Sequence, residues 1–161
     1  MKRITIKSYK VPIRYVPNML SRRDTVKQKQ YIDRSRNAYR HGKYFLRPKV
    51  KSFTSKKSSH VANATKLYGV PNMKPNAALA RATKCKRWAL KKIINKGRGA
   101  YYSSGSRPNQ SPDSWGYARL GSALTGGPSS QIDYHILEKG CQKGSKALQL
   151  ANKTRKLIKS H

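Results

Sequence analysis

Acidic residues are scarce in this sequence, which has five Asp and Glu against 37 Lys and Arg in 161 residues. Acid–base catalysis by paired carboxylates, and nucleases that hold metal ions, need several carboxylates at close spacing. After residue 57 the only acids are Asp113, Asp133 and Glu138, and only the last two are near neighbours. His135 lies between isoleucines, as a packed histidine does. We therefore expect no enzyme, no metal site, no cofactor and no small-molecule substrate.

Cysteine is also rare. Cys85 and Cys141 lie far apart, and no CxxC or Cys/His pair at metal-ligand spacing occurs. We expect two buried free thiols, with a single disulfide as the alternative. No apolar run reaches the roughly 18–20 residues of a membrane span. Lys and Arg interrupt the apolar residues near the N-terminus, unlike in a secretory signal. A soluble protein inside the cell or in a particle is expected.

What the chain has in excess is positive charge, with a formal net charge of +32. Such a chain repels itself over the screening length of about 8–10 Å, so it is stabilised by an anionic partner. Nucleic acid is the usual partner for this charge balance. Residues 1–57 carry 18 of the 37 basic side chains. We predict a polyanion-binding set there, consisting of Arg22, Arg23, Lys27, Arg34, Arg36, Arg40, Lys56 and Lys57.

The stretch 96–127, KGRGAYYSSGSRPNQSPDSWGYARLGSALTGG, is different, because it has little charge and is rich in glycine, tyrosine and tryptophan. It lacks the GxxxxGK[ST] pattern of a phosphate-binding loop. Glycine permits unusual backbone shapes, and the aromatic rings supply large surfaces with polar tips. We predict a loop and helix that bind a partner through Arg98, Tyr101, Tyr102, Arg107, Trp115, Tyr117 and Arg119. Bases could stack on Tyr101 and Tyr102, but packing of the loop is the favoured explanation for these two rings.

The sequence of the first third indicates an arm followed by a helix. Residues 1–20 alternate apolar and polar residues, which indicates extended backbone. Pro12 and Pro17 make this segment an edge strand or an arm lying on a neighbour, with a disordered tail as the alternative. Ser21 and Asp24 predict the start of a helix that ends at Gly42.

The remainder predicts a mainly α module. Helices are expected over 58–69, 76–97, a segment capped by Asp113 or Ser114, 128–140 and 144–161. A strand over 131–137 is the alternative for the fourth. The helix 76–97 has the clearest apolar stripe, which includes Cys85, and Gly97 is expected to end it. The predicted fold is a small helical module with a glycine- and aromatic-rich loop (58–161), preceded by an extended basic arm with one helix (1–57).

Three segments carry a resemblance to a known family. They are SRRDTVKQKQ, YRHGKYFLRPKVKSFTSKKSSHVANATKLYGV and, above all, GRGAYYSSGSRPNQSPDSWGYARLGSALTGGPSSQIDYHILEKGC. Together they resemble a domain family of unknown function in nucleocytoplasmic large DNA viruses of the giant- and algal-virus type. The resemblance runs from about Tyr15 to Ala151. It implies a viral origin and brings no catalytic or ligand residues with it.

These observations lead to a functional expectation. The chain is expected to be a non-enzymatic virion structural protein, a minor capsid or capsid-lining component in the capsid interior and, during assembly, in the virus factory. Its expected partners are capsid proteins and also double-stranded DNA or anionic inner-membrane headgroups. The alternative is a DNA-condensing nucleoprotein packaged with the genome.

Overall fold

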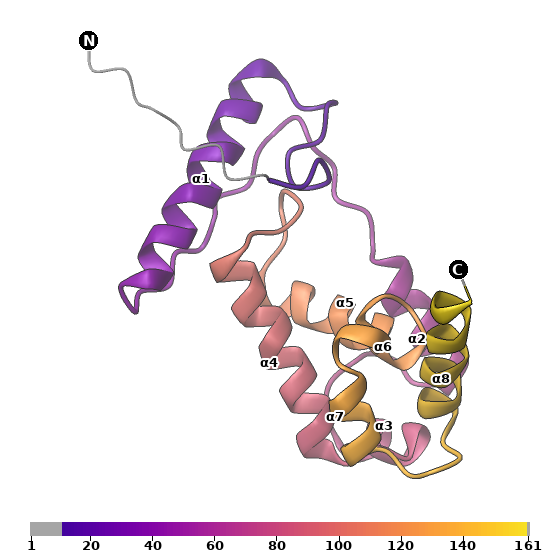
Figure 1. Cartoon of the computed structure of the whole chain (residues 1–161). Coiled ribbons are helices and arrows are strands. Elements are labelled where there is room, and N and C mark those ends of the chain that lie inside the picture. The colour runs from indigo at the N-terminus through magenta and orange to yellow at the C-terminus, as the bar shows by residue number, and fades with distance from the viewer. Residues whose placement is uncertain (1–10, 161) are drawn as a thin grey trace. The chain divides into compact units, whose positions relative to one another are not determined.

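The computed structural model describes residues 11–160 and is mainly α-helical (Figure 1). The fold class predicted from the sequence is therefore confirmed. Within the described residues there are eight helices and no β-strand. The helices are α1 (Arg22–Arg40), α2 (Ser59–Tyr68), α3 (Ala77–Thr83), α4 (Arg87–Ser103), α5 (Pro112–Leu124), α6 (Ser129–Ile132), α7 (Tyr134–Gly140) and α8 (Lys146–Lys159).

The chain forms two compact units. The first contains the chain up to Ser55 together with Tyr102–Gln110, and the second contains Lys56–Tyr101 and Ser111–His161. The sequence predicted two continuous parts, 1–57 and 58–161. In the structure the first unit also includes residues 102–110. The glycine- and aromatic-rich stretch is thus shared between the two units.

The first unit is built on α1. The Ser21 side chain accepts a hydrogen bond from the Asp24 backbone N–H, so this helix starts at the predicted cap. After α1 the chain turns at Gly42 (φ 72°) and runs back beside the helix, as Figure 1 shows. The returning segment meets α1 in antiparallel order, because Arg47 contacts Ser35 and then Ser52 contacts Asp24, near the start of the helix.

The extended backbone expected for residues 1–20 is not found in the described part, residues 11–20. Those residues form successive turns, in which the carbonyls of Pro12, Ile13 and Pro17 accept bonds from the N–H groups of residues 15, 16 and 20. Proline cannot donate to a strand ladder, so local turns satisfy these groups instead. Residues 1–10 lie outside the described residues.

The second unit packs around α5. Helices α2, α6 and α8 contact α5, and the buried core includes Leu90, Ile93, Leu120, Leu124 and Leu137. Glycines in α5 allow close approach. A Cβ on Gly121 would lie 2.7 Å from the carbonyl oxygen of His60 in α2. The absence of a side chain at Gly121 therefore lets the backbones of α2 and α5 approach closely.

The prediction of one continuous helix over 76–97 is wrong in two respects. It is broken after Thr83, where Lys84 adopts a left-handed backbone (φ 56°), and it resumes as α4. It also continues past Gly97 to residue 103. Gly97 does not end the helix. It lies where α4 crosses α5, and a Cβ added to it would lie 2.6 Å from the Cα of Gly116 in α5.

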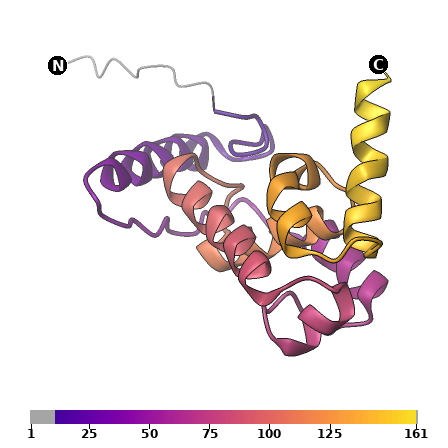
Figure 2. The same ribbon diagram turned by 60° about the horizontal axis from the view of Figure 1, so that its bottom comes forward.

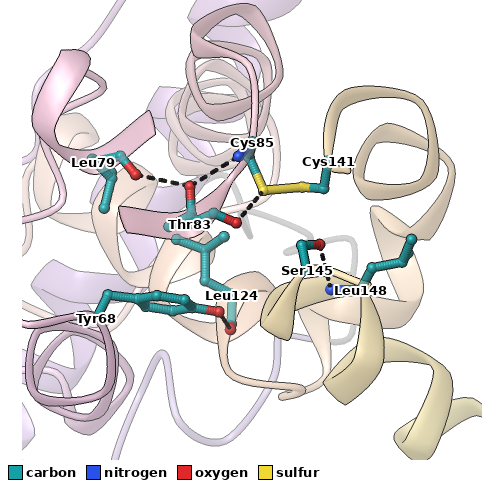
Figure 3. The surroundings of a disulfide bond; sticks show 8 residues. All are labelled: Tyr68, Leu79, Thr83, Cys85, Leu124, Cys141, Ser145 and Leu148. Atoms are coloured by element: carbon teal, nitrogen blue, oxygen red, sulfur yellow. Dashed lines mark hydrogen bonds between the residues drawn. A yellow bond between two sulfur atoms is a disulfide. The ribbon is translucent and has the colours of Figure 1, made fainter. Parts of the chain in front are cut away.

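The expectation of two free thiols is also wrong. Cys85 and Cys141 form a disulfide, which was the alternative (Figure 3). Both are buried, as expected. The break after α3 brings Cys85 beside Cys141, which follows α7. The same break is stabilised by the Thr83 hydroxyl, which donates to the carbonyl of Leu79 and accepts from the Cys85 N–H.

Two local predictions need smaller corrections. The N-cap of α5 is Ser111, in a reciprocal capping box with Ser114, and not Asp113 or Ser114. The segment 128–140 begins with Pro128 as predicted, but it forms two short helices that meet at Asp133, and the strand alternative is not found. The caps Ser58 and Gly69 of α2 are confirmed, and α8 begins after Ser145.

Candidate polyanion-binding surface

The inner face of α1 is unusually polar. Its buried side chains are Asp24, Gln28, Ile32 and Ser35. At 3.6 residues per turn these four positions fall on one stripe of the helix. The basic residues lie on both flanks of this stripe. One row is Arg22, Lys29, Arg36 and Arg40, and the other is Arg23, Lys27 and Arg34.

The flanking cations differ in how they are held. Arg22, Arg23 and Lys29 are exposed. The Arg34 guanidinium lies over the Phe45 ring, 4.6 Å from its centroid, and Arg36 Nε donates to the Ser104 carbonyl at 2.8 Å. Cations that are held by a ring or a carbonyl lose less freedom when they bind a phosphate. The rows therefore combine exposed charges with charges that are held by a neighbouring group.

Hydrogen bonds from the buried side chains fix α1 to the rest of its unit. Gln28 Nε2 donates to the Tyr15 carbonyl at 3.2 Å, and the Ser35 hydroxyl donates to the Tyr102 carbonyl at 3.1 Å. The buried Arg47 donates to the hydroxyls of Ser35 (2.9 Å) and Ser106 (2.7 Å). One buried guanidinium thus joins the helix, the returning segment and the loop 102–110.

Asp24 closes the start of the helix. Its carboxylate accepts from the Ser52 hydroxyl at 2.5 Å and from the Ser52 backbone N–H at 2.7 Å. These two hydrogen bonds favour the charged form and lower the pKa of Asp24 below its ordinary value. The carboxylate therefore stabilises the fold through Ser52. It faces inward and does not neutralise the cations on the outward rows of α1.

Asn109 fixes the other end of the returning segment. Its backbone is left-handed (φ 62°), a conformation that asparagine tolerates. Its side-chain oxygen accepts from the Val50 N–H at 2.7 Å, and its Nδ2 donates to the carbonyls of Val50 and Phe53. The segment beside α1 is thus held without regular secondary structure.

Three tyrosine rings gather near the C-terminal end of α1. Tyr39 and Tyr102 are parallel at 6.4 Å, and Tyr44 tilts against Tyr102 at 5.0 Å. Tyr44 is 71% exposed and Tyr39 39% exposed. This tyrosine cluster (Tyr39, Tyr44 and Tyr102) is an aromatic surface that bases or a protein neighbour can contact.

The predicted partner-binding set is divided between the two units. Tyr102 and Arg107 belong to the first unit and the other five residues to the second. Tyr101 is only 1% exposed, so it is a packing residue, in line with the explanation favoured for the loop tyrosines. Trp115 and Tyr117 are half-buried on α5, and Arg107 is exposed.

Two arginines of that set form internal ion pairs. Arg98 Nε lies 2.7 Å from a carboxylate oxygen of Asp113. Arg119 donates two hydrogen bonds, of 2.8 and 2.9 Å, to the fully buried Asp133, which Lys96 also approaches at 3.6 Å. Asp133 is therefore held by two cations at the junction of α6 and α7, where it stabilises the fold.

The predicted polyanion-binding set is also divided between the units, because Lys56 and Lys57 belong to the second. Six of the eight lie on α1, and Lys56 and Lys57 are exposed in the following segment. Sequence reasoning omitted Lys29, although its seven-residue spacing from Arg22 and Arg36 was visible. It also missed Arg47 and the cluster of Tyr39 with Tyr44, which arise only when the chain returns beside α1.

Two kinds of feature, a cluster of metal-ligand side chains and a membrane-spanning helix, are not found among the described residues. Over residues 11–160, no group of three or more His, Cys, Asp or Glu side chains is placed to hold a metal ion. Among the helices that the structure describes, none is both long and apolar enough to cross a membrane.

Comparison with known proteins places the chain in a family. Neither curated proteins nor solved structures gave a match. One family model matches residues 12–131, which is about three quarters of the chain. Its description names no function, so the viral origin implied by the resemblance stays a prediction. The match covers α1 to α5, including the rows of cations and the tyrosine cluster. The chain therefore belongs to the family of unknown function DUF5824.

Proposed function

We propose that this protein is a non-enzymatic structural protein of a large DNA virus particle and that its first unit binds the phosphate backbone of double-stranded DNA. The observation that supports this most directly is the two rows of cations on α1. The virion setting rests on the sequence resemblance, and the binding surface rests on the geometry of the first unit.

The dimensions of α1 suit a phosphate backbone. Arg22 and Arg40 are separated by about 27 Å along the helix axis, at about 1.5 Å per residue. Double-stranded DNA carries one charge per roughly 1.7 Å of its axis, so a helix of this length can reach several phosphates. The Asp24 carboxylate faces inward and accepts hydrogen bonds from Ser52. Asp33 is therefore the one acid on the outer surface of α1. Binding of this kind reads charge and not base sequence.

The test is DNA binding as a function of salt. Fluorescence anisotropy with a labelled 24-base-pair duplex would measure affinity between about 50 and 300 mM salt. Substitution of Arg22, Arg23 and Lys29 by glutamine removes three exposed charges. We expect the slope of log affinity against log salt to become shallower by about 0.9 for each phosphate that the variant no longer neutralises.

A matched control removes the same charge elsewhere. Lys153, Lys156 and Lys159 are exposed on α8, in the second unit, and their substitution by glutamine also removes three charges. This control should change the slope much less. Equal changes in the two variants would mean that DNA responds only to net charge, and the proposed surface would be wrong.

A second candidate function, a capsid-lining role, is favoured by the tyrosine cluster. Condensing DNA requires charge alone, whereas Tyr44 and the neighbouring Leu46 (63% exposed) present uncharged surface that suits a protein neighbour. Fractionation of purified virions into emptied shell and released genome distinguishes the two functions. Retention in the shell after high-salt extraction supports capsid contact. Release together with the genome supports DNA binding alone.

A further inference from the structure

A second cationic surface lies in the other unit, where the turn between α3 and α4 meets the end of α7. The structure has an open concavity there of about 670 Å³. Four of the nine residues that line it are basic, and none of the nine, all in the described part of the chain, is acidic. The four basic side chains are exposed. They are Arg81, Lys84, Lys86 and Lys139, and both disulfide cysteines also line the concavity.

The two walls of this concavity are joined covalently and by hydrogen bonds. One wall carries Cys85 and the other Cys141, and Figure 3 shows the disulfide between them. On either side of it the Lys86 N–H donates to the Gly140 carbonyl at 2.7 Å, and the Gln142 N–H donates to the Lys84 carbonyl at 2.9 Å. The backbones that carry the cations are therefore held at fixed separation before any ligand arrives, which lowers the entropic cost of binding.

Lys84 is an unexpected residue for its backbone. It has a left-handed conformation (φ 56°), which favours glycine or asparagine. Backbone preference therefore does not explain a lysine at this position. Its side chain lines the concavity together with three other cations whose mutual repulsion is unfavourable. An anion among them would relieve that repulsion.

We propose that this concavity binds a small ligand that carries several phosphate groups. Four cations and no acid in the lining favour a compact ligand of high negative charge, and arginine and lysine are the usual phosphate-binding side chains. The volume is within the range of small-molecule sites. The site belongs to the second unit and α1 to the first, and this proposal does not depend on DNA binding by the first unit.

The experiment uses the full chain labelled with ¹⁵N and tripolyphosphate as the probe, at about physiological salt. Amide shifts locate the binding, and calorimetry measures the affinity. The variant combines Lys84→Asn with Lys139→Gln. Asparagine tolerates the left-handed backbone, so the first change removes a charge without adding strain. The control, Lys153→Gln with Lys156→Gln, removes two charges from α8 in the same unit.

We expect tripolyphosphate to shift the amides of residues 80–86 and 139–142. The variant should bind at least tenfold more weakly, and the control should change by less than twofold. Equal losses in variant and control, or shifts concentrated on α1, would overturn the proposal. A 24-base-pair duplex serves as a second ligand. If the duplex shifts residues 80–86 and tripolyphosphate does not, the site takes a nucleic-acid backbone and the small-ligand proposal is wrong.

Discussion

At the scale of single residues, the first unit depends on polar side chains that are buried and bonded. Gln28, Ser35 and Arg47 occupy positions where most helical domains place aliphatic residues. Each donates to a carbonyl or hydroxyl, so desolvation is offset by hydrogen bonds. Geometry in such an interior is specific, because a buried donor without its acceptor is unfavourable. This specificity holds α1 in one position against the returning segment and the loop 102–110.

Asp24 gives this interior a pH dependence. Because its hydrogen bonds to Ser52 lower its pKa in the folded state, it stabilises the fold above the ordinary aspartate value of about 4. That contribution is lost as the pH falls through the lowered pKa. We expect Asp24→Asn to reduce stability more at pH 7 than at pH 2. Urea unfolding at the two pH values, followed by tyrosine fluorescence, measures the difference.

Asp33→Asn is the control for that prediction. Asp33 is exposed on the same helix, so its substitution removes the same charge without removing the Ser52 contacts. Its effect should be small at both pH values. A decrease at pH 7 as large as that of Asp24→Asn would mean that helix charge, and not the buried hydrogen bonds, is responsible.

At the scale of elements, the crossing of α4 and α5 rests on two glycines. A Cβ on Gly116 would lie 2.7 Å from the carbonyl oxygen of Ile94, and a Cβ on Gly97 would lie 2.6 Å from the Cα of Gly116. Neither neighbour is the end of a flexible side chain. The two helices must therefore separate to admit a methyl group.

This crossing gives a prediction about the sign of a stability change. In an open helix, glycine to alanine stabilises by up to about 1 kcal/mol. For Gly97→Ala and Gly116→Ala we expect a net destabilisation of about 1–3 kcal/mol, because overpacking outweighs the helix propensity. Thermal unfolding of both single variants and the double variant measures it. Because both changes widen the same crossing, the double variant should be destabilised by less than the sum of the two.

Elements also show how far the sequence could predict the fold. The caps Ser21, Ser58 and Gly69 are local signals, and the ends they mark are as predicted. The break after Thr83 and the continuation past Gly97 depend on contacts with Cys141 and Gly116, which are distant in the sequence. Periodicity does not report such contacts. For the same reason composition predicted the cations of α1, whereas the tyrosine cluster required the returning chain.

At the scale of the whole molecule, cohesion must overcome a net charge of +32. Within the second unit, the buried core draws residues from α2, α3, α4, α5, α7 and α8. The last turns of α8 extend beyond their neighbours, as Figure 2 shows, and Leu157 and Ile158 are exposed there. Buried apolar contact is therefore unevenly distributed along the chain. A covalent link between distant segments adds to the packing that holds this unit together.

The Cys85–Cys141 disulfide is that link, and it closes a loop with a sequence separation of 56. Loop-closure entropy for such a length corresponds to roughly 4 kcal/mol, and measured values are typically 2–4 kcal/mol. We expect reduction by a dithiol to lower the free energy of unfolding by about 2–4 kcal/mol. Urea unfolding with and without the dithiol measures this. The variant Cys85→Ser with Cys141→Ser should match the reduced protein and should not respond to the dithiol. If the oxidised and reduced chains unfolded at the same urea concentration, the backbone hydrogen bonds of Lys86 and Gln142 would be sufficient to hold the two segments together.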